Sequence, residues 1–364
     1  MRHRERASDR AARGLGEARV TTTVTPPFVS ATLREYGDLT RAALKSYLPS
    51  SEPRRYLYDL LAEYPRRASK MLRPSLCIAT ARAFGARLGD ALRTAVAIEL
   101  LHNALLIHDD IEDGSTERRG HPTLHLLHGV PLAINAGDTL TLLSLRPLIE
   151  NVTTIGPRLS LRILQETERM GLESAEGQAM ELGWCRDNAT DICDADYLRM
   201  VLKKTCWLAT IYPTRAGALI GTHGGVSLDP FVRFGFFLGA TFQIQDDLLN
   251  LVGDPQRYGK ELDGDLYEGK RTLMLIHLLR ESAPDERAQL CEVLRLPREA
   301  RSSAHVRWIR GLMQVHGCID YARQLAHGLA GAALHEYELL YGSLPESRDK
   351  RFIEGLVTWV FERT

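Results

Sequence analysis

The chain has 364 residues, of which 44% are hydrophobic and 25% charged, an ordinary composition for a globular protein that can bury a sizeable core. Its 46 basic and 46 acidic residues give a formal net charge of zero, which argues against a general nucleic-acid binder. No apolar run approaches the roughly 20 residues of a membrane span, and the six cysteines lack zinc-site spacing, so we expect reduced thiols in a cytoplasmic protein.

The first 27 residues differ from the rest of the chain. They are polar, rich in arginine, and end in two prolines. They lack the apolar core of a secretory signal, and Glu5, Asp9 and Glu17 count against an organelle transit peptide. We therefore expect residues 1–27 to form a disordered tail. Residues 28–364 contain no linker rich in proline, glycine or serine and are expected to form one domain.

Apolar residues recur at helical spacing over most of the remaining chain. Five such segments span residues 29–48, 90–109, 158–182, 194–221 and 229–253. Glycine, serine and proline separate the helical segments at 120–122, 129–131, 156–157, 253–255 and 282–284, and alternating strand patterns are absent. Several segments are apolar around most of their circumference. This pattern predicts an all-α, single-domain helical bundle around a central cavity.

Two acidic clusters follow apolar runs in two of these segments, where helical burial would normally exclude charge. The clusters are HDDIED, with Asp109, Asp110 and Asp113, and QDDLLN, with Asp246, Asp247 and Asn250. Positions i and i+4 lie on one face of a helix, one turn apart. Carboxylates at this density repel one another unless a divalent cation neutralises them, and Mg²⁺ prefers such oxygen ligands together with water and phosphates. Either cluster alone could instead be an acidic helix end held in salt bridges, but the pair favours metal binding.

Only seven of the 46 basic residues are lysines. Where arginine serves as the general surface cation, a remaining lysine suggests a specific role, because an ammonium and a guanidinium are not interchangeable. Five lysines lie near the acidic clusters or inside apolar segments: Lys70, Lys203, Lys204, Lys260 and Lys270. Each alone is more often a solvated charge. Together with nearby arginines, they are interpreted as anchors for two phosphorylated ligands, one bridged by magnesium and one held directly.

These motifs, in their order along the chain, resemble those of the trans-type isoprenyl diphosphate synthases of the polyprenyl synthetase family. KMLRP resembles GKxLRP, the first acidic cluster with ERRG resembles the first aspartate-rich motif, GQAMEL resembles GQxxDL, KKT resembles the KT segment, and FQIQDDLLN resembles the second aspartate-rich motif. The resemblance implies the isoprenoid synthase fold and a homodimer. It also implies condensation of isopentenyl diphosphate with an allylic diphosphate, supported by roughly three Mg²⁺ ions per site.

The resemblance also implies roles for individual residues. The metal ligands would be Asp109, Asp110, Asp113, Asp246 and Asp247. The allylic diphosphate would be bound by Arg118, Lys204 and Lys260, with Lys270 as a further candidate. Isopentenyl diphosphate would be bound by Lys70, Arg73, His102 and Arg119. The oxygen dipoles of Thr205 and Gln243 would stabilise the allylic cation, and Gln178 falls in the GQxxDL segment.

Two positions depart from the family pattern. Glu181 replaces the aspartate of GQxxDL, and Asn250 replaces the aspartate that most often ends the second acidic motif. An amide oxygen can accept a hydrogen bond from a metal-bound water but brings no charge. The third metal site is therefore expected to depend mainly on Asp246 and Asp247, and Asn250 is not interpreted as inactivating.

The implied mechanism is ionisation of the allylic C–O bond in a dry pocket, attack by the double bond of isopentenyl diphosphate, and loss of a proton to the released diphosphate. Two alternatives stay open. A class I terpene cyclase would share the fold but would not need Lys70, Arg73 and Arg119. A non-catalytic regulatory subunit would typically lack one aspartate-rich motif.

Product length should depend on the residues that precede Asp109 by one helical turn, about 5.4 Å. These are Ala104 and Leu105, and Ala104 is too small to block chain growth. Further candidate stoppers are Leu101, His102, Leu140, Leu142, Leu143 and Leu145. We expect mainly the twenty-carbon geranylgeranyl diphosphate, with a twenty-five-carbon product as its nearest rival.

Overall fold

The structure is a computed structural model that describes residues 27–254 and 261–362. Within these ranges the only strands are β1 (Glu117–Arg118) and β2 (His121–Pro122), which pair antiparallel, and helices dominate elsewhere. The predicted all-α class is therefore confirmed. Residues 1–26 of the predicted tail, and also Lys260, lie outside the described residues, and Pro27 already begins the first helix.

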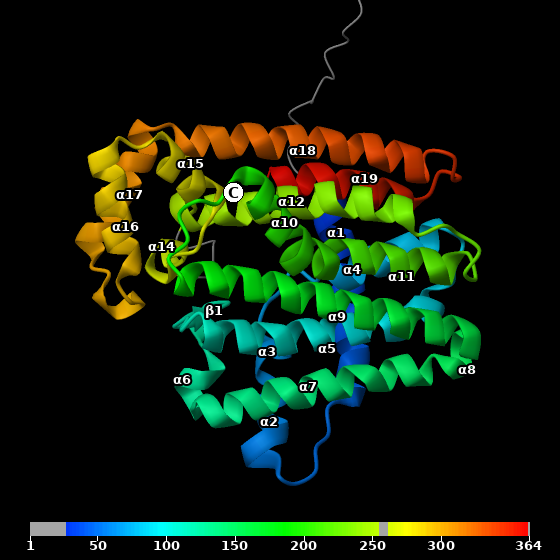
Figure 1. Ribbon diagram of the computed structural model, residues 1–364. Coiled ribbons are helices and arrows are strands. Elements are labelled where there is room, and N and C mark those ends of the chain that lie inside the picture. The colour runs from blue at the N-terminus through cyan, green and yellow to red at the C-terminus, as the bar shows by residue number, and fades with distance from the viewer. Residues whose placement is uncertain (1–26, 255–260, 363–364) are drawn as a thin grey trace, which may run out of the picture.

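The first half of the chain forms five long helices with short helices between them. The long helices are α1 (Pro27–Leu44), α4 (Leu72–Ala83), α5 (Leu88–Glu112), α7 (Val130–Glu150) and α9 (Pro157–Arg186). The short ones are η1 (Lys45–Tyr47), η2 (Arg54–Tyr58), α2 (Asp59–Leu61), α3 (Glu63–Arg66), α6 (Leu124–His128) and α8 (Val152–Ile155). Figure 1 shows α7 running lengthwise beside α5, against which it packs.

The second half closes the bundle over the other side of α5. Its helices are α10 (Asp194–Val201), η3 (Leu202–Ile211), α11 (Tyr212–Gly221), α12 (Asp229–Val252), α14 (Gly264–Glu268), α15 (Leu273–Glu281), α16 (Pro284–Arg295), η4 (Arg298–Ala300), α17 (Ser303–Val315), α18 (Cys318–Tyr341) and α19 (Arg348–Phe361). In Figure 1, α18 and α7 lie toward opposite sides of the bundle, and α16 and α17 lie at one end.

Most predicted breaks coincide with helix boundaries. Gly129 and Gly156 adopt positive φ angles of 83° and 80° and immediately precede α7 and α9, whose first turns contain proline. The predicted single helix over residues 194–221 is instead three consecutive helical pieces. Its middle piece, η3, is a π-helix, a wider form that is frequent at functional sites.

Helix α5 is the centre of the core. It contributes buried side chains, among them Ile98, Ala95 and Leu100, to each of the three hydrophobic clusters that the described residues form. This explains why α5 is apolar around most of its circumference, as predicted for several helices. Its carboxyl end carries the first acidic cluster. None of the described helices is both long and apolar enough to cross a membrane.

Candidate active site

A cavity of about 1030 Å³ opens beside the carboxyl end of α5. Its walls come from residues 68–73, from α5, α9, η3 and α12, and from the segment around α14. Both predicted acidic clusters and both groups of predicted cations contribute to these walls. The cavity therefore brings together residues from motifs that are far apart in the sequence.

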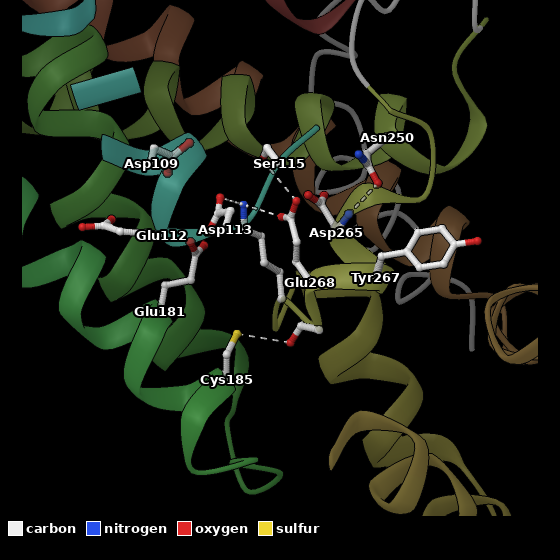
Figure 2. A network of polar contacts seen from close by, with 12 residues as sticks. Asp109, Glu112, Asp113, Ser115, Glu181, Cys185, Asn250, Asp265, Tyr267 and Glu268 are labelled. Carbon is white, nitrogen blue, oxygen red and sulfur yellow. Dashed lines mark hydrogen bonds and ion pairs between the residues drawn. The ribbon is translucent and has the colours of Figure 1, made fainter. Parts of the chain in front are cut away.

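On the α5 side, Asp109 lines the cavity and Asp113 lies one turn further along the helix (Figure 2). Asp109 accepts hydrogen bonds from Lys204 Nζ at 3.2 Å and from an Arg118 guanidinium nitrogen at 3.1 Å. Asp113 accepts one from Lys270 Nζ at 2.6 Å. Burial raises the pKa of Asp113 to about 7, against the opposing effect of Lys270. Burial would also raise the pKa of Asp109, but Lys204, Lys270 and Arg118 hold it below its usual range.

Asp110, like Asp113, is not among the residues that line the cavity, and its role as a metal ligand stays a prediction. Its side chain is fully buried. One carboxylate oxygen accepts a hydrogen bond from the Tyr64 hydroxyl, and the other accepts one from Arg118 Nε at 2.7 Å. The physical reason for the burial of Asp110 is helical geometry, because a residue one position after Asp109 points to a different face of α5. Asp110 instead fixes Arg118, whose guanidinium also reaches Asp109.

On the α12 side, Asp246 and Asp247 line the cavity. The two oxygens of Asp247 accept hydrogen bonds from Gln243 Nε2 at 2.7 Å and from the Tyr197 hydroxyl at 2.8 Å. Burial raises the pKa of Asp247 to about 7, although both hydrogen bonds oppose this. Thr205 Oγ1 donates to Gln243 Oε1 at 2.7 Å, so one chain of hydrogen bonds joins η3 to α12. No sequence signal identifies Tyr197 as part of this chain.

The neighbouring lysines of the KKT motif point in different directions. Lys204 lines the cavity and makes ion pairs with Asp109 and Glu181. Lys203 pairs instead with Glu173 and Glu176 on α9, at 2.7 and 2.5 Å. Glu181, the departure from the aspartate of GQxxDL, therefore still serves as a carboxylate partner of the cavity lysine.

The glycine of the GQAMEL motif allows α9 and η3 to approach closely. A Cβ atom at Gly177 would lie 2.2 Å from the backbone nitrogen of Lys204, so any other residue would push the helices apart. The following Gln178 donates from Nε2 to Glu112 Oε2 at 2.6 Å and joins α9 to α5. This close contact brings Lys204 and Thr205 to the cavity wall.

A second cationic group lines another part of the same cavity: Lys70, Arg73, His102 and Arg119. Arg119 adopts a positive φ of 56° beside Gly120 in the two-residue turn between β1 and β2. Its guanidinium donates to the Tyr64 carbonyl at 3.0 Å and to Asn103 Oδ1 at 3.3 Å. The Lys70 ammonium lies 5.5 Å from the Trp359 ring centroid.

Two buried nitrogens of this second group lack a hydrogen-bond partner among the described residues. They are Arg73 Nε and His102 Nδ1. Burial lowers the pKa of Arg73 to about 10, and burial together with Arg73 and Arg119 lowers the pKa of His102 well below its ordinary value. Buried polar atoms are normally paired, so an anionic ligand would satisfy these nitrogens.

The acidic residues offer carboxylate oxygens, which are the ligands that a hard divalent cation prefers. Asp109 and Asp113 offer carboxylate oxygens from α5, and Asp246 and Asp247 offer them from α12. Over residues 27–254 and 261–362, no three acidic, histidine or cysteine side chains converge on one point. Magnesium is commonly bound through one or two carboxylates, with water and substrate phosphates completing its shell, so this separation suits an ion that arrives with a phosphorylated ligand.

The residues proposed to limit product length divide into three environments. Leu105 lines the cavity. Ala104 is fully buried in the core cluster that α5 shares with Ala136 and Leu140 of α7. Leu142 and Leu145 are 68% and 38% exposed on the outside of α7, which corrects their prediction as stoppers within one protomer. Of the remaining candidates, Leu101 lies in the core and His102 belongs to the second cationic group. Leu143 packs against the cluster that α5 shares with α7.

Known proteins resemble the chain over most of its length. The sequence model of the family described as polyprenyl synthetase matches residues 54–313. A short chain isoprenyl diphosphate synthase of Methanothermobacter thermautotrophicus is 32% identical, covering 81% of this chain and 86% of that protein. A geranylgeranyl pyrophosphate synthase of Geoglobus acetivorans is 30% identical, covering 92% and 99%. The crystal structure of geranylgeranyl pyrophosphate synthetase from Pyrococcus horikoshii superimposes with a TM-score of 0.81 at 28% identity, covering 92% of this chain and 98% of that one.

Proposed function

Because the chain belongs to the polyprenyl synthetase family, we propose that it is a trans-prenyltransferase that joins isopentenyl diphosphate to an allylic diphosphate. The main support is that one cavity carries two separate cationic groups. Arg118, Lys204 and Lys270 are paired with carboxylates, whereas Arg73 and His102 retain buried nitrogens without a partner among the described residues. This arrangement suits one diphosphate bound with metal ions and a second bound directly.

Four carboxylates would hold the metal ions: Asp109, Asp113, Asp246 and Asp247. We propose Mg²⁺, with roughly three ions per site, because oxygen ligands and substrate phosphates suit this ion. When bound, Mg²⁺ neutralises charge on the diphosphate and so favours its departure. The carboxylates now engaged by Lys204, Lys270 and Arg118 would turn to the ions, and the three cations would then donate to the diphosphate oxygens.

The remaining residues would orient the reactants and protect the cation. Lys70, Arg73, His102 and Arg119 would hold isopentenyl diphosphate so that its double bond faces the allylic carbon. The oxygens of Thr205 and Gln243 would stabilise the cation after the C–O bond breaks. Leu105, Leu208 and other apolar wall residues would exclude water. A new carbon–carbon bond then forms, and the product loses a proton to the released diphosphate.

The second cationic group separates this proposal from a class I terpene cyclase, which needs no second diphosphate. The presence of both acidic clusters at the cavity counts against a non-catalytic regulatory subunit. Incubation with labelled isopentenyl diphosphate plus dimethylallyl, geranyl or farnesyl diphosphate, followed by product chromatography, tests all three. Elongation supports the proposal, a hydrocarbon indicates a cyclase, and activity only with an added partner protein indicates a regulatory subunit.

We propose geranylgeranyl diphosphate as the main product. Leu105 and Leu106, four and three residues before Asp109, line the cavity, and aliphatic side chains there leave more room than an aromatic ring would. Two geranylgeranyl synthases resemble more than nine-tenths of the chain, but so does a geranylfarnesyl diphosphate synthase, so a twenty-five-carbon product stays the nearest rival. The chain-length analysis in the product assay measures this directly.

We also propose that the protein is a homodimer. Ten of the fourteen most exposed large hydrophobic residues in the described part of the chain lie on α6 to α9: Leu126, Leu127, Val130, Ile134, Leu142, Leu145, Ile149, Val152, Leu161 and Leu172. Such a concentration of exposed apolar side chains is typical of an interaction surface. Helix α7 carries half of them and lies at one edge of the bundle (Figure 1), where a second copy could cover it.

A further inference from the structure

Asn250 belongs to the second acidic cluster but is not among the residues that line the cavity. It is 3% exposed, at the carboxyl end of α12. Three hydrogen bonds join it to the segment that leads into α14. Its carbonyl oxygen accepts from the Asp263 amide at 2.9 Å, its Nδ2 donates to the Glu261 carbonyl at 3.3 Å, and its Oδ1 accepts from the Asp265 amide at 3.2 Å.

The side-chain bonds require an amide at position 250. Asparagine carries both a donor and an acceptor, whereas an ionised aspartate can only accept. In an Asn250→Asp variant, one carboxylate oxygen would face the Glu261 carbonyl oxygen where Nδ2 now donates. The variant would lose a hydrogen bond and gain a repulsion between two acceptors. The contacts with Glu261 and Asp265 therefore favour asparagine over aspartate at position 250.

The segment held by Asn250 carries a carboxylate that does line the cavity. Asp265 belongs to the first turn of α14 and is one of the residues that line the cavity. Figure 2 shows it joined to Asn250 through its backbone amide. Its carbonyl oxygen also accepts from the Lys270 amide at 2.9 Å, which links it to a second cavity residue.

Asp265 lies on the side of the cavity formed by the second acidic cluster. Like Tyr197 and Asp247, it lines the cavity. Tyr197 is the residue that donates to Asp247. Asp247 of α12 and Asp265 of α14 thus line the same cavity.

We infer that Asp265 supplies a carboxylate for the divalent cations that position 250 lacks, and that Asn250 is a positioning residue that holds Asp265 toward the cavity. The inference rests on the proposed metal-assisted prenyl transfer. It assigns Asn250 a structural role. A metal-binding oxygen is retained in the site, but from the segment that follows α12.

The substitution Asn250→Asp separates this inference from the simpler view that Asn250 is a weakened metal ligand. Under the simpler view, the aspartate restores a ligand and lowers the magnesium concentration needed for half-maximal activity. Under our inference, it disturbs Asp265 and raises that concentration, by about tenfold or more. A lower or unchanged requirement would overturn the inference.

Hydrogen exchange measures the positioning role without any turnover. In Asn250→Ala, the Asp265 amide loses its acceptor and should exchange faster. The Asp263 amide donates to the main-chain carbonyl of Asn250 and should keep its protection, which makes it an internal control. Equal protection of Asp265 in both proteins, or loss of protection throughout the segment, would contradict a specific side-chain contact.

Binding of Mn²⁺ in the presence of inorganic diphosphate, followed by electron paramagnetic resonance, tests the role of Asp265. Asp265→Asn should weaken Mn²⁺ binding by about tenfold or more. The matched control is Asp263→Asn, because Asp263 lies two residues away and pairs with Arg310 at 3.0 Å. Equal effects of both variants, or none, would overturn the assignment. Since the binding experiment needs no product, a failure of the proposed activity would appear separately, as wild-type protein that binds metal without elongating a chain.

Discussion

The Lys204 ammonium lies 3.2 Å from Asp109 Oδ1, although the two residues are 95 positions apart and come from η3 and α5. The same ammonium also contacts Glu181 on α9. Burial would lower the pKa of Lys204, but Glu181 and Asp109 hold it above its ordinary value. Cations and carboxylates thus neutralise each other within the cavity. A metal–diphosphate ligand could exchange with both partners without leaving a buried charge unpaired.

Replacing the cavity carboxylate of α5 should remove most of the activity. Asp109→Asn is expected to lower kcat by about a thousandfold, because metal binding provides several kcal/mol of leaving-group stabilisation. The melting temperature should change little, since Asp109 faces the cavity. Asp110→Asn is the comparison variant. It should raise KM for the allylic substrate through Arg118 while leaving the magnesium requirement unchanged. A shifted magnesium requirement in Asp110→Asn would support Asp110 as a direct metal ligand.

The two cationic groups should respond to different substrates. Arg73→Gln is expected to raise KM for isopentenyl diphosphate by roughly tenfold to a hundredfold, the effect of losing one hydrogen bond to a charged group. Lys204→Ala should act mainly on the allylic side. Lys203→Ala provides a matched control, because Lys203 pairs with Glu173 and Glu176 away from the cavity. If Arg73→Gln changed both Michaelis constants equally, the two diphosphates would not occupy the separate positions proposed.

His102 should make stability depend on pH. Burial, with Arg73 and Arg119 nearby, lowers its pKa well below the ordinary 6.5. The unfolded chain therefore takes up a proton first as the pH falls below about 6.5, and the folded protein loses up to about 1.4 kcal/mol per pH unit. Below pH 6.5, the free energy of unfolding of the wild type, measured with urea, should therefore fall with pH. The same free energy should depend less on pH in His102→Gln. Inorganic diphosphate should also reduce the pH dependence of the wild-type unfolding free energy, because an anion beside His102 raises the pKa of the histidine. A wild-type slope identical to that of His102→Gln would contradict this.

The exposed face of α7 should be required for dimer formation. Leu142→Glu is expected to convert the dimer to monomer in analytical ultracentrifugation, because it places charge in an apolar contact. Leu339→Glu on α18 is a matched control, since Leu142 and Leu339 are 68% and 66% exposed. Dissociation by both variants, or by Leu339→Glu alone, would place the interface elsewhere.

Local spacing predicted the part of the site that depends on one helix. Asp109 and Asp113 lie one turn apart on α5, as the i and i+4 positions require. The same geometry turns Asp110 to another face. Its partner Tyr64 lies 46 residues earlier, and no pattern in the sequence pairs the two. The partners of Asp110 therefore could not be predicted from the sequence, and its role as a metal ligand stays a prediction.

Two other features could not be predicted from the sequence, because they also depend on tertiary contacts. The role of Asn250 depends on partners 11 to 15 residues later, after the chain has left α12. Leu142 and Leu145 fit an apolar helical pattern, but such a pattern does not distinguish a face packed on the core from a face open to a second chain. The all-α fold was easier to predict, because helical periodicity repeats in segment after segment.

Product length should respond to the residue at the cavity wall. Leu105→Phe places a ring in the cavity one turn before Asp109 and should shorten the main product from geranylgeranyl toward farnesyl diphosphate. Ala104→Phe tests the neighbouring position. Ala104 is fully buried against Ala136 and Leu140, so a ring there must displace packed neighbours, and overpacking typically costs about 1–3 kcal/mol.

Ala104→Phe is therefore expected to shorten the product only with a lower melting temperature, whereas Leu105→Phe should do so without one. Chain-length analysis and thermal unfolding of both variants separate these outcomes. A Leu105→Phe enzyme that still makes the wild-type product would place the limit of chain growth on another wall of the cavity. A wild-type product of fifteen carbons would mean that the cavity already ends at Leu105.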